Sequence, residues 1–158
     1  MPNSKDIGLV SILCVFLLAG FGCDGSTDVS TSTGDPWRSK LSAEQYHILR
    51  ENGTEIPFSS PLETEKRPGT YYGADCSQPL FRSEQKYNSG TGWPSFWAPI
   101  TEDALVLKED DSIPFSPRTE VLTQCGGHLG HVFDDGPKPT GKRYCMNGAA
   151  LVFVPDEP

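Results

Sequence analysis

Residues 125–147 read CGGHLGHVFDDGPKPTGKRYCMN, and this stretch indicates both the fold class and the chemistry of the chain. It contains two short strand-like runs, at 131–135 and 142–148, separated by an acidic turn rich in Gly and Pro. Partly alternating runs bounded by such turns are typical of antiparallel strands. Similar runs occur at residues 71–75, 80–87, 103–110, 118–124 and 150–154.

One helix is expected before these strands. Ser42 and Gln45 have the spacing of a capping box. Tyr46, Ile48 and Leu49 then supply an apolar stripe, and Gly53 is the expected C-terminal stop. The sequence therefore predicts a mainly β domain of the α+β class, with a loop-like segment at residues 54–70.

The chemically reactive side chains of the opening stretch are a thiol, two imidazoles and their neighbours. Cys145 follows Arg143 closely, and a nearby cation favours the thiolate form of a cysteine. Asn147 lies two residues further on, so Arg143, Cys145 and Asn147 would share one face of a strand. Cys145 is therefore a candidate nucleophile, with a buried small apolar residue as the alternative. His128 and His131 have two interpretations: both reach a site, or they form a turn with one histidine hydrogen-bonded in the core. Arg143 either helps to keep Cys145 as a thiolate or is a surface cation without that role.

The chain resembles a known family in several places. HLGHVFDDGPKPTG followed by KRYCMNGAALVF resembles the C-terminal signature of the methionine-R-sulfoxide reductases, the B-type family. SGTGWPSFW at 89–97, PLF at 79–81 and LSAEQYHILRENGTEIPFSSPL at 41–62 are also similar to that family. The resemblance covers roughly residues 37–155, in the family's order.

This resemblance implies two antiparallel sheets around a catalytic strand, with helices at the periphery. It also implies thiol-dependent reduction of methionine-R-sulfoxide in oxidised proteins or peptides. Cys145 would attack the sulfur and become a sulfenic acid, while His131 and Asn147 would position water or donate to the oxygen. Trp93 matches the residue whose ring receives the substrate methyl group. Phe133 is a second candidate for the pocket, with a buried strand residue as the plainer interpretation.

The remaining cysteines depart from the family pattern. Many members bind a structural zinc through two CxxC pairs, but here Gly73 and Leu122 stand three residues before Cys76 and Cys125. A Cys₄ site cannot form, so no cofactor is expected. Cys76 and Cys125 would instead form a structural disulfide, or one of them would resolve the sulfenic acid. Thr91 occupies the place of the resolving cysteine of some members, which favours an external, extracytoplasmic thioredoxin-like reductant.

A non-enzymatic zinc-binding module is the alternative class of protein. Cys76, Cys125, His128 and His131 could form a Cys₂His₂ zinc site in a non-enzymatic binding module. Cys145 would then be a buried strand residue. The KRYCMN run favours the enzyme, because a zinc module does not need Arg, Cys and Asn on one strand face.

The N-terminal residues indicate export. Residues 7–22 are almost wholly apolar, which suits a signal peptide at 1–22 better than a membrane span. Cys23 follows directly and is a candidate lipidation site, so we expect a periplasmic or membrane-anchored lipoprotein; the alternatives are simple secretion or an uncleaved anchor. Residues 23–36 are polar and would form a flexible tether, and residues 37–156 would form the reductase domain.

Length, composition and charge indicate the number of domains and exclude some classes of partner. The chain has 158 residues, 36% of them hydrophobic, which suits one soluble domain. A net charge of −8 argues against binding to nucleic acid or to an anionic membrane surface.

Overall fold

The computed structural model describes residues 35–157. The predicted signal peptide, Cys23 and all but the last two residues of the predicted tether lie outside the described residues. None of the helices within residues 35–157 has the length and the apolar character that a membrane crossing requires.

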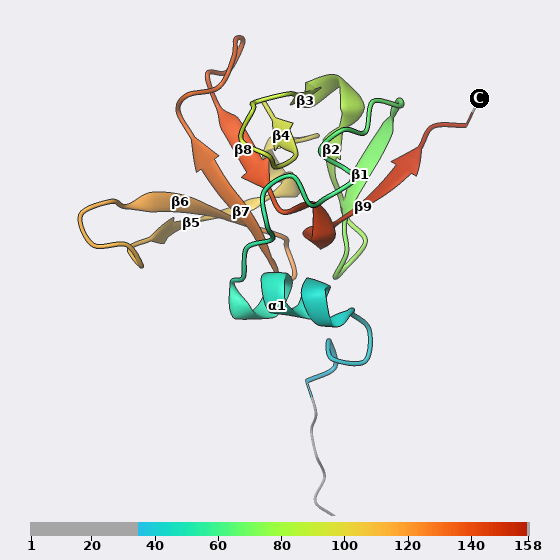
Figure 1. Cartoon of the computed structure of the whole chain (residues 1–158), viewed down its shortest axis with the longest axis vertical. Coiled ribbons are helices and arrows are strands. Elements are labelled where there is room, and N and C mark those ends of the chain that lie inside the picture. Colours follow the sequence, from blue (N-terminus) through green and yellow to red (C-terminus); the bar gives the residue numbers. More distant parts are fainter. Residues whose placement is uncertain (1–34, 158) are drawn as a thin grey trace, which may run out of the picture. The chain divides into compact units, whose positions relative to one another are not determined.

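The described residues form two antiparallel sheets and one α-helix, α1 (Ala43–Glu51), as Figure 1 shows. The predicted mainly β fold is confirmed. The 3-stranded sheet has the order β2 (Pro79–Arg82), β1 (Gly69–Gly73) and β9 (Leu151–Pro155). The 6-stranded sheet has the order β3 (Lys86–Tyr87), β4 (Ser95–Phe96), β8 (Arg143–Met146), β7 (His128–Phe133), β6 (Arg118–Leu122) and β5 (Val106–Asp110). Three short 3₁₀ turns connect the strands: η1 (Ser83–Gln85), η2 (Glu102–Ala104) and η3 (Gly148–Ala150).

Strand β8 lies inside the larger sheet, between β4 and β7. Its Cys145 pairs with Ser95 of β4 on one side and with His131 of β7 on the other. Side chains directly opposite one another in an antiparallel pair project from the same face of the sheet. The sheet register therefore places an imidazole next to the thiol.

Helix α1 begins as the sequence predicts. The backbone N–H of Gln45 donates to the Ser42 hydroxyl at 3.1 Å, and the backbone N–H of Ser42 donates to the Gln45 side chain at 3.0 Å. The C-terminal end differs from the prediction by one residue, because Asn52, with φ of 55°, takes the left-handed position expected for Gly53. Asn tolerates this conformation better than most residues do, since its short polar side chain bonds locally.

Three strand predictions needed correction. The run predicted at 80–87 is two strands, β2 and β3, with the turn η1 between them. Strand β7 begins at His128 instead of residue 131, and β4 was not predicted. Two residues after a proline are too few to show an alternating pattern, so β4 exists through its pairing with β3 and β8.

Aromatic side chains join the two sheets. Tyr71 of β1 and Phe81 of β2 pack against Phe96 of β4, with ring centroids 4.9 Å and 4.2 Å apart respectively. All three are fully buried. Burying each such side chain stabilises the fold by roughly 1.5–3 kcal/mol.

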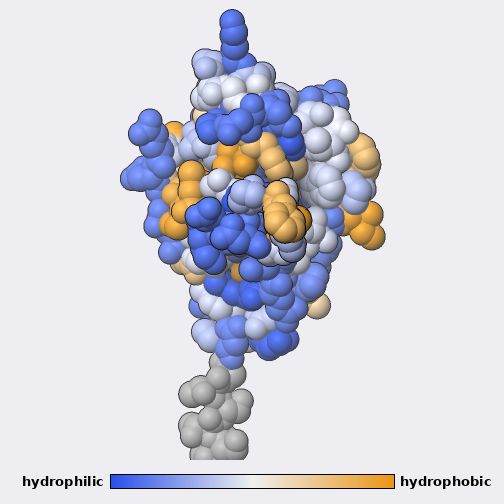
Figure 2. Space-filling model, turned by 90° about the vertical axis from the view of Figure 1, so that its left-hand side faces the viewer, coloured by the Kyte–Doolittle hydropathy of each residue, from blue (hydrophilic) through white to orange (hydrophobic). Residues whose placement is uncertain are grey.

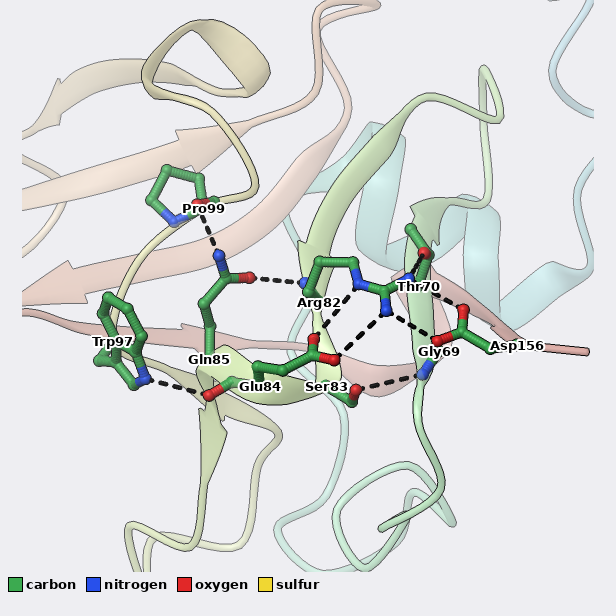
Figure 3. A network of polar contacts seen from close by, with 9 residues as sticks. All are labelled: Gly69, Thr70, Arg82, Ser83, Glu84, Gln85, Trp97, Pro99 and Asp156. Atoms are coloured by element: carbon green, nitrogen blue, oxygen red, sulfur yellow. Dashed lines mark hydrogen bonds and ion pairs between the residues drawn. The ribbon is translucent and has the colours of Figure 1, made fainter. Parts of the chain in front are cut away.

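A polar network holds the outer end of the 3-stranded sheet (Figure 3). The Arg82 guanidinium donates to both carboxylate oxygens of Asp156, at 2.9 and 2.7 Å, and to the Thr70 hydroxyl at 2.7 Å. It also pairs with Glu84 at 3.2 Å. This network fixes the end of β9 beside β1 and β2.

The β5–β6 hairpin projects from one side of the domain in Figure 1. Figure 2 looks onto that side, where separate apolar patches lie within a mostly hydrophilic surface. The exposed apolar side chains on β5 and in the loop after it are Val106, Leu107, Ile113 and Phe115.

Candidate active site

A cavity of about 150 Å³ lies at the junction of β7 and β8. Six residues that the sequence singled out line it: Trp93, His128, His131, Phe133, Cys145 and Asn147. Thr54, Arg118 and Gly130 complete the lining and were not predicted.

A bulge in β7 brings the two histidines together. Residues three apart in a regular strand face opposite sides of the sheet. Here the register of β7 against β6 shifts between the pairs Val121–Gly130 and Leu122–His128, and Gly130 has φ of 153°. The imidazole centroids of His128 and His131 consequently lie 5.4 Å apart. The alternative of a turn with one histidine bonded in the core is correct only in part: His128 is buried and bonded to Glu120, but both histidines lie on strand β7 and both line the cavity.

Glycine is required at this bulge for a second reason. A Cβ atom on Gly130 would lie 2.1 Å from the carbonyl oxygen of Cys145. Real contacts of that length do not occur, so β7 and β8 could not keep their spacing with any other residue.

The Cys145 thiol is half-buried and faces a hydroxyl. The Thr91 Oγ1 atom lies 3.7 Å from Cys145 Sγ. Thr91 is in turn 2.8 Å from the Ser89 hydroxyl, which is 2.7 Å from the Ser95 hydroxyl. This chain of hydroxyls can direct one O–H toward the sulfur. From the sequence, Thr91 was noted only because it stands where some family members have the resolving cysteine. The contact of its hydroxyl with the Cys145 thiol was not predicted.

His131 is held by a carboxylate on the neighbouring hairpin. Its Nε2 atom lies 2.8 Å from Asp110 Oδ2, which also accepts from the Arg118 guanidinium at 2.6 Å. Hydrogen bonds from Ser112, His131 and Arg118 hold the pKa of Asp110 well below its usual range. Asp110 is therefore a carboxylate, so His131 Nε2 carries a proton and Nδ1 is left for the cavity.

His128 is also hydrogen-bonded to a carboxylate. Its Nδ1 atom lies 2.7 Å from Glu120 Oε1, and both side chains are buried. Burial lowers the pKa of His128, and the Glu120 carboxylate only partly offsets that effect. A lowered pKa makes His128 a neutral imidazole at pH 7.

Asn147 is fixed from two sides. Its Oδ1 atom accepts the backbone N–H of Glu55 at 2.9 Å, and its Nδ2 donates to the Leu129 carbonyl at 3.0 Å. The same Glu55 accepts the indole N–H of Trp93 on its carbonyl at 3.2 Å and the backbone N–H of Gly148 on its carboxylate at 2.6 Å. Glu55 thus positions both the amide and the indole, a role that its place in a loop did not predict.

Arg143, which the sequence also singled out, is not among the residues that line the cavity. Its guanidinium makes two bonds of 2.8 Å to the Asp135 carboxylate, and its central carbon lies 4.4 Å from the centroid of the Phe133 ring. The Asp135 bonds raise the pKa of Arg143, and the charge of Cys145 acts in the same direction. Arg143 is therefore an anchored cation that keeps Phe133 against the cavity.

Comparisons with known proteins agree with this arrangement. The family model described as SelR domain matches residues 41–155. The chain belongs to the SelR family. "Peptide methionine sulfoxide reductase MsrB" of Methanosarcina mazei is 52% identical over 124 residues, which are 78% of this chain and 88% of that protein. The proteins of the same name from Agrobacterium fabrum and Leptospira interrogans are 50% and 51% identical, over 82% and 80% of this chain and 96% and 95% of their own lengths.

Cys76 and Cys125 of this SelR domain are absent from the lining of the cavity. Their sulfur atoms and a carboxylate oxygen of Asp75 all lie within 4.8 Å of one another. The group does not fit tetrahedral zinc, since two thiolates are missing and the Arg50 guanidinium sits 2.9 Å from Asp75 Oδ2. A cation at that distance opposes a second cation.

The Cys₂His₂ alternative also lacks support among residues 35–157. His128 and His131 are not part of the group formed by Asp75, Cys76 and Cys125. Both imidazoles are bonded to carboxylates, and they line the cavity that contains Cys145.

Proposed function

We propose that this protein reduces methionine-R-sulfoxide in oxidised proteins to methionine, with Cys145 as the nucleophile. The observation that carries the proposal is the pairing of Cys145 with His131 across β7 and β8, at a small cavity with aromatic walls. A sulfoxide sulfur becomes electrophilic when its oxygen is protonated or hydrogen-bonded. The reaction therefore needs a thiolate, a proton donor and an apolar pocket in one place.

In the first step the Cys145 sulfur attacks the sulfoxide sulfur, and a sulfur–sulfur bond forms. The sulfoxide oxygen takes a proton as it loses its double-bond character. His131 is the donor, because it is the direct neighbour of Cys145 and its ring is held in place by the contact of Nε2 with Asp110. The oxygen then bonds to the Cys145 sulfur, and methionine leaves as the sulfur–sulfur bond breaks. Two electrons have passed from Cys145 to the substrate, which leaves a sulfenic acid on the protein.

The walls of the cavity select the substrate. The indole N–H of Trp93 is already bonded to Glu55, so the ring offers an apolar surface to the methyl group of the substrate. Phe133 forms a second aromatic surface, and Asn147 offers an amide N–H to the oxygen. His128, neutral through burial, can accept a hydrogen bond without adding charge.

Two external thiols then restore the enzyme, releasing water and a disulfide. Cys125 is three positions before His128, and His128 is three positions before His131, the strand partner of Cys145. The strand portion alone spans roughly 10 Å. We therefore assign recycling to an external dithiol protein of the thioredoxin type, outside the cytoplasm.

The proposed location rests on the N-terminal sequence. An apolar segment at 7–22 followed by Cys23 supports export and lipidation of that cysteine. Metabolic labelling with a lipid precursor tests the anchor. Label on the wild type and its loss in Cys23→Ala supports it, whereas label on neither protein contradicts it.

The activity is tested by epimer-resolved kinetics. Purified protein is given N-acetyl-methionine-R-sulfoxide or the S epimer, with dithiothreitol as reductant. We expect turnover of the R epimer alone, loss of turnover in Cys145→Ser, and its retention in the matched Cys125→Ser control. Preference for the S epimer, or equal activity of Cys145→Ser and wild type, would remove the proposal.

A further inference from the structure

Two thiols that the proposed reaction does not use face each other between the two sheets. Cys76 lies in the turn between β1 and β2, and Cys125 lies in the turn between β6 and β7. Their sulfur atoms lie within 4.8 Å of each other, and both are free thiols in the structure. The two turns belong to different sheets, so only tertiary structure brings the sulfurs together.

Hydrogen bonds hold the two turns in place independently of the sulfurs. The Gln78 side chain accepts the backbone N–H of Gln124 at 2.7 Å through Oε1 and donates to the Ala104 carbonyl at 2.6 Å through Nε2. The Cys76 thiol donates to the same Gln78 oxygen at 3.4 Å. The backbone beside each cysteine is thereby fixed against the other turn.

A buried carboxylate forms the second part of this clamp. Asp75 Oδ2 accepts from the Thr123 hydroxyl at 2.7 Å and from the Arg50 guanidinium at 2.9 Å. Arg50 also donates to the Cys125 carbonyl at 3.1 Å. Helix α1 therefore holds both cysteine-bearing turns, and the thiols are kept close in the reduced protein.

The two thiols differ in their access to solvent. Cys125 is exposed, whereas Cys76 is half-buried, and burial raises the pKa of Cys76 to about 12. An external reagent therefore meets Cys125 first.

We propose that Cys76 and Cys125 are an oxidisable pair that closes to a disulfide and joins the two sheets covalently. The oxidant is an external disulfide, from a small molecule or from a thiol–disulfide oxidase. Cys125 thiolate attacks it, forming a mixed disulfide and releasing one thiolate. Cys76 thiolate then attacks the Cys125 sulfur and releases the second. The two protons of the cysteines pass to the two released thiolates, and two electrons move to the oxidant.

This disulfide holds the two sheets together. The group of Asp75, Cys76 and Cys125 does not suit tetrahedral zinc, yet a cross-link at the same place constrains the unfolded chain over the whole segment from β2 to β6. It also ties down the turn that leads into β7 and its histidines. The inference does not depend on the proposed reductase activity.

The test uses the full chain carrying Cys145→Ser, so that the catalytic thiol takes no part. The protein is equilibrated with oxidised glutathione, quenched, alkylated and mapped by mass spectrometry without reduction. We expect a linked peptide pair containing Cys76 and Cys125. In Cys76→Ser, Cys125 should instead retain glutathione, because no second thiol within residues 35–157 of this variant is left to displace it.

A stability measurement provides an independent readout. The linked protein should melt roughly 10 °C above its reduced form, and Cys76→Ser should show no such difference. Recovery of both cysteines as free thiols after equilibration would overturn the inference. So would one equivalent of tightly bound zinc that protects both thiols from oxidation.

Discussion

Replacing Gly130 with alanine should disrupt the site through geometry alone. The new methyl group would stand 2.1 Å from the Cys145 carbonyl oxygen, so β7 and β8 must separate by on the order of 1 Å. Overpacking of this kind costs about 1–3 kcal/mol. The φ of 153° adds about 1–3 kcal/mol for a residue with a side chain. The free energy of unfolding should therefore fall by about 2–6 kcal/mol, which a domain in the middle of the usual range, at about 10 kcal/mol, survives.

Gly130→Ala should lose more activity than its lower stability accounts for. A displacement of about 1 Å between reacting groups can reduce a rate about 100-fold. Gly141→Ala is the matched control, because Gly141 also has positive φ, of 71°, but nothing lies within 4 Å of its Cβ position. Urea unfolding followed by tryptophan fluorescence gives the stability, and kcat/KM on methionine-R-sulfoxide gives the activity. If folded Gly130→Ala is as active as Gly141→Ala, the argument that the bulge places His131 against Cys145 is wrong.

Three further predictions concern groups around the cavity. Asp110→Asn should lower kcat on methionine-R-sulfoxide by about 10–100-fold, since His131 loses the carboxylate that holds its ring beside Cys145; an unchanged kcat contradicts this role. The lowered pKa of His128 means that the unfolded chain binds its proton at a higher pH than the native protein. The free energy of unfolding should therefore fall as pH drops below about 6.5, and His128→Gln should lose that part of the decline in urea titrations; an identical decline in both proteins would exclude His128 as its source. Thr91→Val should slow alkylation of Cys145 by iodoacetamide about fivefold, because the sulfur loses its hydrogen-bond contact with the hydroxyl 3.7 Å away; an unchanged rate would show that the hydroxyl does not act on the sulfur.

Much of this architecture follows from local sequence patterns. Ser42 and Gln45 predict the start of the helix because a capping box depends only on residues three apart. The spacing of Cys145 and Asn147 likewise predicts that both face one site, and both line the cavity. The antiparallel fold class follows from the run of short strands between turn residues.

The unpredicted features depend on contacts between distant residues. Asp110 is 21 residues before the histidine that it holds, and Glu55 is 92 residues before Asn147. No local pattern marks either carboxylate as part of the site. The bulge at Gly130 could not be predicted either, because a shift of register is defined only relative to the partner strand.

The central claim is that one sulfur, that of Cys145, takes the oxygen from the substrate. It is tested most directly by a single turnover without reductant, in the presence of dimedone, which traps sulfenic acids. The account predicts one methionine released per protein and one dimedone adduct, on Cys145. An adduct on Cys76 or Cys125 instead, or methionine released by Cys145→Ser, would contradict it.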